Sequence, residues 1–179
     1  MTDKIILGFL KNKELTAYDI KKGMEKSTSF FYSSSLGSIN PALKKLEQDK
    51  QLSCNEVIEN HRLKKYYKIT KLGEQKYFEW LVEPINIGRI KEQALVRLFF
   101  LGDLNKQMQT DLIKKYLKEL NIIINDLKQM KNEAEKNKIK PKDLQKAKFQ
   151  FATLDFGLEY YKFTSTWFSN LLKEISNED

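Results

Sequence analysis

Short polar and basic side chains gather in the run SSLGSINPALKKLEQDK, which occupies residues 34–50. Hydroxyl, amide and ammonium groups of this size can hydrogen bond to base edges and to phosphates, and no carboxylate interrupts them before Glu47. Helical periodicity places five of them on the outer and flanking surface of one helix: Ser35, Ser38, Asn40, Lys44 and Lys45. The pattern favours contact with a nucleic acid. The alternative is a purely structural role, in which the serines only cap the helix and the lysines form a solvated face.

A second basic cluster follows in the connection ENHRLKK, where four residues carry or can carry positive charge: His61, Arg62, Lys64 and Lys65. The flanking runs, Leu52–Glu59 and 64–70, alternate as strands do. We therefore expect a hairpin whose tip, residues 60–63, reaches a minor groove or flanking phosphates. Considered alone, His61 is more typical of an ordinary exposed loop.

Three predicted helices precede and include the polar run. The first covers residues 4–10. The second begins after Thr16, with Asp19 completing an acidic capping box, and runs to about Ser27. The third buries its apolar positions, namely Leu36, Ile39, Leu43 and Leu46. Pro41 lies within it, so either this helix begins later or it bends.

Helices followed directly by a two-stranded ribbon predict a winged helix-turn-helix, which points to double-stranded DNA. A fourth helix ends near Leu81, and Pro84 and Gly88 then interrupt the helical pattern. We expect a DNA-binding domain over residues 1–84 and a helical domain over residues 89–179. The fold class is mostly α with a small β-wing.

The second half of the chain is entirely helical in pattern. A short apolar helix is expected over 93–101 and a long one over 106–135, with its stripe on Leu112, Tyr116, Leu120, Ile123, Leu127 and Met130. From Pro141 onwards, apolar residues from Leu144 to Ile175 recur at alternating spacings of three and four, which is a heptad seam. The two long helices should pack antiparallel as a hairpin.

The last helix carries more apolar surface than one hairpin can bury, because Phe149, Phe156, Tyr160, Phe163 and Trp167 lie off the main seam. A partner chain would cover this surplus, so we expect a homodimer. The residues assigned to dimerisation are Phe151, Leu154, Leu158, Tyr161, Trp167, Phe168, Leu171 and Leu172.

The residues resemble the PadR-like transcriptional regulators, in the shorter subgroup whose C-terminal region is similar to that of virulence activators. The resemblance rests on ILGFL at 6–10, SINPALKKLE at 38–47, RLKKYYKITKLGE at 62–74 and ALVRLFFLG at 94–102. It implies a regulator that binds a two-fold symmetric operator. Repression is the commoner mode in such proteins, although the subgroup also includes activators.

Two positions depart from the family pattern. Asn40 stands where members often have a tyrosine close to DNA, which suggests an altered sequence preference. Lys50 stands where a glycine often ends the third helix, which leaves the position of that helix end open.

Aromatic residues of the second half suggest a pocket for a small aromatic or cationic effector, lined by Phe99, Phe151, Tyr160, Phe163 or Trp167. Regulators that resemble this one are often released from DNA by a small molecule. Packing in the core or at a dimer interface is the alternative interpretation of the same stripe.

Other classes of protein fit less well. The chain has one cysteine, one histidine and no glycine-rich phosphate loop, so we expect no enzyme, no cofactor and no metal site. Its apolar runs are too short for a signal or a membrane span, and we expect a cytoplasmic protein. The net charge of +8 favours an anionic partner. A winged-helix scaffold that does not touch DNA remains an alternative.

Overall fold

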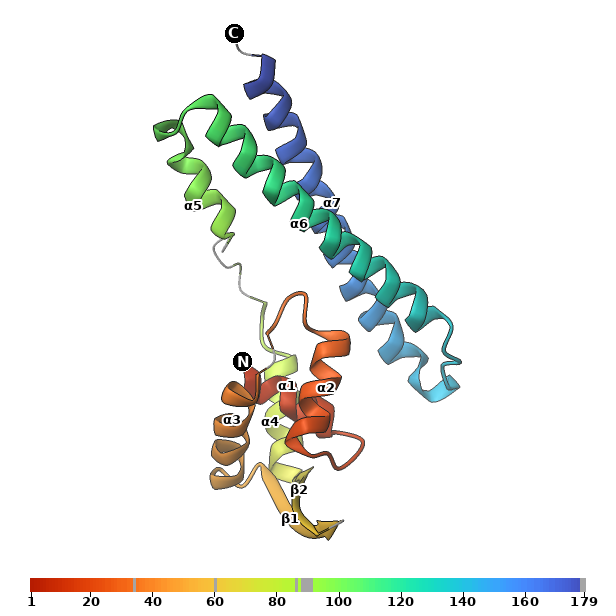
Figure 1. The fold of residues 1–179 in the computed structure, drawn as a ribbon. Helices are drawn as coiled ribbons and strands as arrows, with labels where there is room; N and C mark the ends of the chain where they lie inside the picture. Colours follow the sequence, from red (N-terminus) through yellow and green to blue (C-terminus); the bar gives the residue numbers. More distant parts are fainter. Residues whose placement is uncertain (34, 60, 86, 88–91, 178–179) are drawn as a thin grey trace. The chain divides into compact units, whose positions relative to one another are not determined.

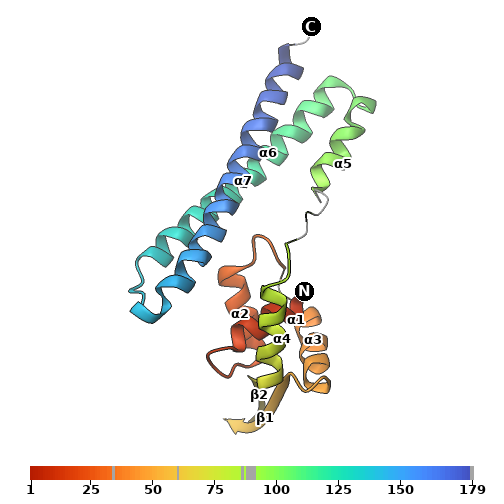
Figure 2. The same ribbon diagram turned by 180° about the vertical axis from the view of Figure 1, so that it is seen from behind.

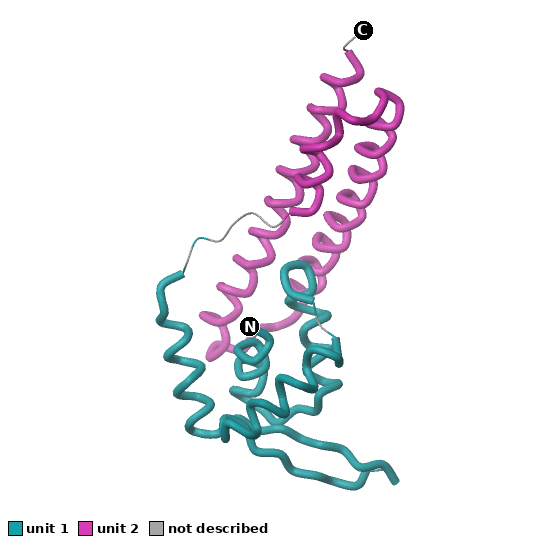
Figure 3. Tube along the Cα trace, turned by 90° about the vertical axis from the view of Figure 1, so that its left-hand side faces the viewer, with its two compact units in different colours: residues 1–87 teal, residues 88–179 magenta. Residues whose placement is uncertain are grey.

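The computed structural model describes residues 1–33, 35–59, 61–85, 87 and 92–177. The chain divides into two compact units, Met1–Ile87 and Gly88–Asp179 (Figure 3). Asn60 of the expected wing tip and residues 88–91 at the expected domain boundary lie outside the described residues.

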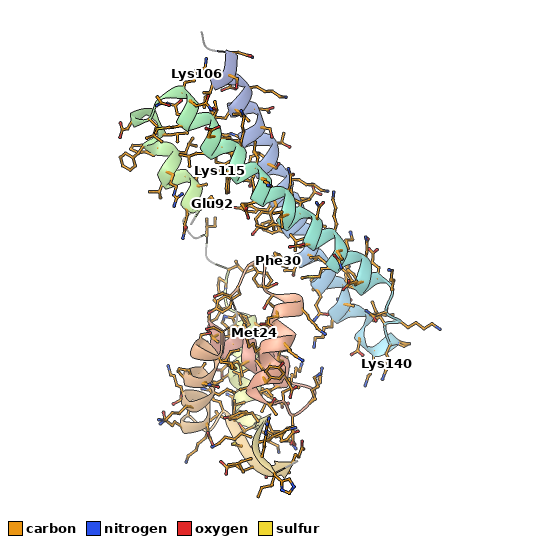
Figure 4. All side chains as sticks on the ribbon, viewed as in Figure 1. Met24, Phe30, Glu92, Lys106, Lys115 and Lys140 are labelled. Carbon is orange, nitrogen blue, oxygen red and sulfur yellow. The ribbon has the colours of Figure 1, made fainter. Side chains whose placement is uncertain are left out.

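The first unit contains α1 (Thr2–Leu10), α2 (Ala17–Ser27), α3 (Leu36–Gln48), β1 (Leu52–Glu59), β2 (Arg62–Ile69) and α4 (Lys71–Leu81) (Figure 1). Its core forms where α1, α2 and α3 meet, and Met24 lies inside it (Figure 4). Ile39, Leu43 and Leu46 of α3 are buried as predicted. The prediction for Leu36 was wrong, because this side chain is 40% exposed. Leu36 is the first residue of the helix, one turn short of the stretch that the other helices cover.

The start of α2 confirms the capping box. The Thr16 hydroxyl accepts from the Asp19 amide at 3.1 Å, and the Asp19 carboxylate accepts from the Thr16 amide at 3.1 Å. Two amides that the helix cannot satisfy internally are therefore paired. The Thr16 hydroxyl also donates to the Asp19 carboxylate at 2.6 Å, and this bond is the main cause that lowers the pKa of Asp19.

Helix α3 runs through Pro41 without interruption, so a start after the proline is ruled out. Its C-terminal end lies at Asp49, and Lys50 follows in the left-handed region with φ of 57°. The chain then turns directly into β1, so α3 and the β1–β2 hairpin are adjacent in sequence.

The hairpin β1–β2 is antiparallel, with its register running from Leu52 opposite Ile69 to Glu59 opposite Arg62. β1 has the predicted bounds. β2 begins at Arg62, two residues earlier than expected, so Arg62 and Leu63 of the expected tip belong to the strand. His61 has φ of 60°, the left-handed conformation that tight hairpin turns use.

The second unit contains α5 (Gln93–Phe99), a short 3-10 helix (Leu101–Asp103), α6 (Lys106–Glu135), a second 3-10 helix (Pro141–Asp143) and α7 (Leu144–Asn177). Helices α6 and α7 lie side by side and antiparallel in both views (Figures 1 and 2). Lys140 marks the turn that joins them (Figure 4).

The hairpin of the second unit buries a stripe on each long helix. The buried residues are Ile113, Leu120, Ile124 and Leu127 of α6, and Ala147, Leu154, Leu158 and Phe168 of α7. The other residues of the predicted α7 seam are half-buried, except Leu144, which is the first residue of the helix and is 56% exposed. In the predicted stripe of α6, Leu112 is 39% exposed and its neighbour Ile113 is buried instead. No helix within the described part of the chain has the length and apolar character needed to cross a bilayer.

Candidate nucleic-acid interface

The outer surface of α3 carries the predicted contact residues. Asn40, Lys44 and Lys45 are exposed. Among the described residues, no carboxylate lies within ion-pair distance of either lysine. Both ammonium groups are therefore free to bind phosphate without first breaking an ion pair.

The two serines hold the start of α3. The Ser35 hydroxyl accepts from the Ser38 amide at 3.2 Å, and the Ser38 hydroxyl donates to the Ser35 carbonyl oxygen at 2.9 Å. Ser35 also donates to the Ser38 hydroxyl at 3.2 Å. Because both hydroxyl protons are donated within the cap, the two hydroxyl oxygens can act towards DNA only as hydrogen-bond acceptors in this arrangement. Such groups suit the amino groups of adenine and cytosine better than phosphate oxygens.

The wing is less positive than its sequence suggests. Lys64 pairs with Glu59 at 2.6 Å, and Lys65 pairs with Glu56 at 2.7 Å. Tyr66 donates its hydroxyl proton to the same Glu59 carboxylate at 3.0 Å. The bond from Lys64, then that from Tyr66, hold the pKa of Glu59 below its usual value. Sequence reasoning missed both glutamates as partners because the cross-strand register decides which acid faces which base.

Arg62 is the cation of the wing without such a partner. It is exposed at the tip, opposite Glu59 in the register, and no ion pair to it exists within the described part of the chain. His61 is exposed beside it. Cations without an ion-pair partner among the described residues thus lie on the outer face of α3 and at the end of the wing.

The residues assigned to dimerisation fall on more than one face of α7. Leu154, Leu158 and Phe168 are already buried within the single chain, at 5–6% exposed. They pack in the hairpin, where the Phe168 ring meets that of Tyr116 at 4.8 Å between centroids. The half-buried members are Phe151, Tyr161, Leu171 and Leu172, and Trp167 is 43% exposed. A partner chain would therefore meet chiefly the aromatic residues that lie off this seam.

The second unit also contains a cavity of about 400 Å³, lined by Glu92, Gln93, Ala94, Arg97, Leu98, Leu101, Leu112, Ile113, Tyr116 and Phe168. None of the five residues predicted for an effector pocket lines it. The lining of this cavity comes from residues in and around α5 together with α6 and α7, which no single helical stripe brings together. Phe99, next to the lining residue Leu98, is 82% exposed.

Glu92 is the acidic group of this cavity. One carboxylate oxygen accepts from the Ala94 amide at 3.2 Å and so caps α5, while the other accepts from the Tyr160 hydroxyl at 2.9 Å. Burial, followed by the interaction with Glu92, raises the pKa of both Tyr116 and Tyr160 to about 12. The cavity combines apolar walls with a few polar groups, which is the usual composition of a small-molecule site.

Comparisons with known proteins agree with this architecture. The model of the transcriptional regulator PadR-like family matches residues 6–79, and that of the virulence activator alpha C-terminal region matches residues 90–176. The negative transcriptional regulator PadR of Bacillus subtilis (strain 168) is 31% identical over 124 residues, which cover 68% of each chain.

Two solved structures of B. subtilis PadR share the fold. The complex with operator DNA is 27% identical, covers 97% of this chain and 98% of that one, and has a TM-score of 0.83. The complex with p-coumaric acid is 24% identical, covers 98% of both chains, and has a TM-score of 0.78. The chain therefore belongs to the PadR-like family of transcriptional regulators, a class of DNA-binding winged-helix proteins and not of enzymes.

Proposed function

We propose that this regulator represses transcription by binding a two-fold symmetric operator as a homodimer, in the cytoplasm. The observation that carries the proposal is the outer face of α3, where Asn40, Lys44 and Lys45 are exposed and the two lysines have no acidic partner among the described residues. The operator complex of B. subtilis PadR supports the same role for this unit. Two copies of α3 would enter successive major grooves, about 34 Å apart or a multiple of that distance.

DNA binding is tested by selecting duplexes from a random library and measuring fluorescence anisotropy over a range of salt concentrations. The double variant Lys44→Gln, Lys45→Gln should bind all duplexes more weakly and reduce the slope of log Kobs against log salt by about two per subunit. The matched control is Lys114→Gln, Lys115→Gln, an adjacent exposed pair on α6 (Lys115 in Figure 4) that removes the same charge.

If the two double variants lose the same affinity for duplexes, the protein is attracted to DNA by its net charge alone. A wild-type chain that selects no duplex and shows no salt-dependent binding would favour the scaffold alternative.

The homodimer is supported by a second seam on α7. Phe149, Phe156 and Phe163 follow each other at intervals of seven and are 62%, 72% and 68% exposed. With Thr153, Tyr160 and Trp167 they form an alternating spacing of four and three, which is a heptad pattern. Aromatic surface of this extent on one helix is typical of a protein interface.

Light scattering tests the dimer directly. Phe156→Ser with Phe163→Ser should halve the mass in solution, whereas Phe31→Ser, an equally apolar exposed change in the first unit, should leave it unchanged. A wild-type chain with the mass of a monomer at micromolar concentration would refute the dimer.

Release by a small molecule is the remaining part of the proposal, and the cavity beside Glu92 is its candidate site. An aromatic ligand could pack between Tyr116 and Leu112 while a hydroxyl or cationic group meets Glu92. B. subtilis PadR is known in complex with p-coumaric acid, which supports an effector of the phenolic class.

Calorimetric titration with phenolic and cationic compounds tests this site. Leu112→Trp should fill the cavity and abolish binding, and Leu144→Trp, on an exposed residue of α7 outside the lining, should not. Heat that persists in Leu112→Trp would move the site elsewhere. A reporter gene behind a selected operator gives the sign of regulation, since activation would raise its expression.

A further inference from the structure

Two apolar side chains face each other at the end of the wing. Ile58 and Leu63 are direct partners in the β1–β2 register, and they are 75% and 59% exposed. They lie on the same face of the hairpin as Leu52, which is buried at 3%, because side chains alternate along a strand. The wing therefore carries an exposed apolar pair on the same face as buried Leu52, at the far end of the hairpin.

The pair is not an extension of the core. From the base of the hairpin towards the tip, this face carries Leu52 with Ile69, Cys54 with Tyr67, Glu56 with Lys65, and finally Ile58 with Leu63. The Glu56–Lys65 ion pair, exposed on both side chains, thus separates the apolar tip from the core. Because both side chains remain largely exposed, burial within the first unit contributes little stabilisation to this cross-strand pair.

The surroundings of the pair indicate what covers it. Arg62 precedes Leu63 in β2, so its side chain lies on the opposite face at the same end of the hairpin, and it has no ion-pair partner among the described residues. Glu56 and Glu59 are paired with Lys65 and Lys64. The partner that covers Ile58 and Leu63 should therefore carry negative charge beside a surface that is apolar or consists of stacked rings. Duplex DNA has that combination in its minor groove, where phosphates border the sugars and the base stack.

We propose that Ile58 and Leu63 form an apolar wedge that enters the minor groove beside the base pairs contacted by α3, while Arg62 binds the adjacent phosphate. Insertion partly unstacks one base step and bends the duplex towards the major groove. The wedge would make the operator preference depend on how easily the flanking step deforms, a form of recognition that needs no hydrogen bond to a base. This inference rests on the proposed DNA-binding function.

The test uses the full chain and a duplex selected by the wild type, with 2-aminopurine placed in turn at each flanking position and dyes at the two ends. The variant is Ile58→Thr with Leu63→Thr, which keeps residues that favour strands. Val57→Thr is the matched control, because Val57 is 36% exposed on the opposite face of the same strand.

The wild type and Val57→Thr should raise 2-aminopurine fluorescence at one flanking step and shorten the end-to-end distance measured by energy transfer. The double variant should lose both signals and bind about tenfold more weakly with an unchanged salt slope, since no charge is removed. Arg62→Gln should instead reduce the slope by about one per subunit.

Binding and bending by the double variant equal to those of Val57→Thr would overturn the wedge while leaving DNA binding intact. A double variant whose mass in solution differs from the wild type without DNA would assign the pair to a second copy of the chain, and would overturn the wedge as well. Failure of the wild type to select any duplex is a separate result, because it removes the proposed function itself.

Discussion

The backbone amide of Gln51 donates to the carbonyl oxygen of Leu46 at 2.8 Å, across the end of helix α3. The amide of Lys50 donates to the Glu47 carbonyl at 3.0 Å in the same turn. These two bonds make a Schellman motif around a left-handed residue, which is usually glycine. Lys50 takes that place with φ of 57°, so α3 ends at Gln48 without a glycine after it.

Lys50→Gly should stabilise the first unit by about 1 kcal/mol, because glycine adopts the left-handed conformation without the steric cost that a Cβ imposes. Thermal unfolding followed by circular dichroism should show a midpoint raised by several degrees. Lys50→Ala is the control, since it removes the same charge and keeps the strain. An equal gain in both variants would attribute the effect to charge.

Gly73→Ala should destabilise the first unit by about 1–3 kcal/mol through overpacking. A Cβ at this position would lie 2.2 Å from the Gln51 carbonyl oxygen, a backbone atom that cannot move aside independently. That oxygen accepts from the Thr70 amide at 3.0 Å, so the clash would also disturb the junction of β2 and α4.

Gly37→Ala is the matched control for this change, because the nearest atom to its Cβ would be the Ser35 hydroxyl oxygen at 3.7 Å. It should leave the midpoint of urea unfolding unchanged or raise it, since alanine favours a helix. Midpoints that fall equally in both variants would contradict the close approach at Gly73.

Local patterns in the sequence predict the elements well, and the exceptions lie at their ends. The capping box at Thr16 needs only two residues three apart, and the structure confirms it. Periodicity alone placed Leu36 and Leu144 in the core, yet each is the first residue of its helix and remains exposed. The sequence did not show whether α3 begins before or after Pro41, because the Ser35 cap determines where this helix begins.

The candidate interface was predictable in its composition but not in its electrostatics. Lys64 and Lys65 are identifiable as basic residues of a hairpin, whereas their pairing with Glu59 and Glu56 depends on the register and side-chain geometry of two strands. The cavity beside Glu92 shows the same limit more strongly, because its lining residues span positions 92–168. Only packing of α5 against the α6–α7 hairpin brings such positions together.

Glu59→Gln should strengthen binding to any duplex, because it releases the Lys64 ammonium group that the carboxylate holds at 2.6 Å. A freed lysine that reaches a phosphate would steepen the slope of log Kobs against log salt by up to about one per subunit. Glu14→Gln is the control, since it frees Lys68 from its ion pair towards the base of the wing. Anisotropy titrations at several salt concentrations measure both slopes, and identical slopes in all three proteins would place Lys64 away from the DNA.

Tyr116 and Tyr160 should titrate near pH 12, about two pH units above ordinary tyrosines, because burial and then the neighbouring Glu92 carboxylate disfavour the phenolate. A pKa raised in the folded state stabilises the fold fully below pH 10, and this stabilisation is lost as the pH rises from 10 to 12. Absorbance at the phenolate band should therefore show a late step, and Tyr160→Phe or Tyr116→Phe should each remove one tyrosine from it. Glu92→Gln should move the step towards lower pH while leaving the number of tyrosines unchanged. A late step that neither phenylalanine variant reduces would show that the Glu92 network does not form as described, and the cavity would lose the polar groups that suit it to an effector.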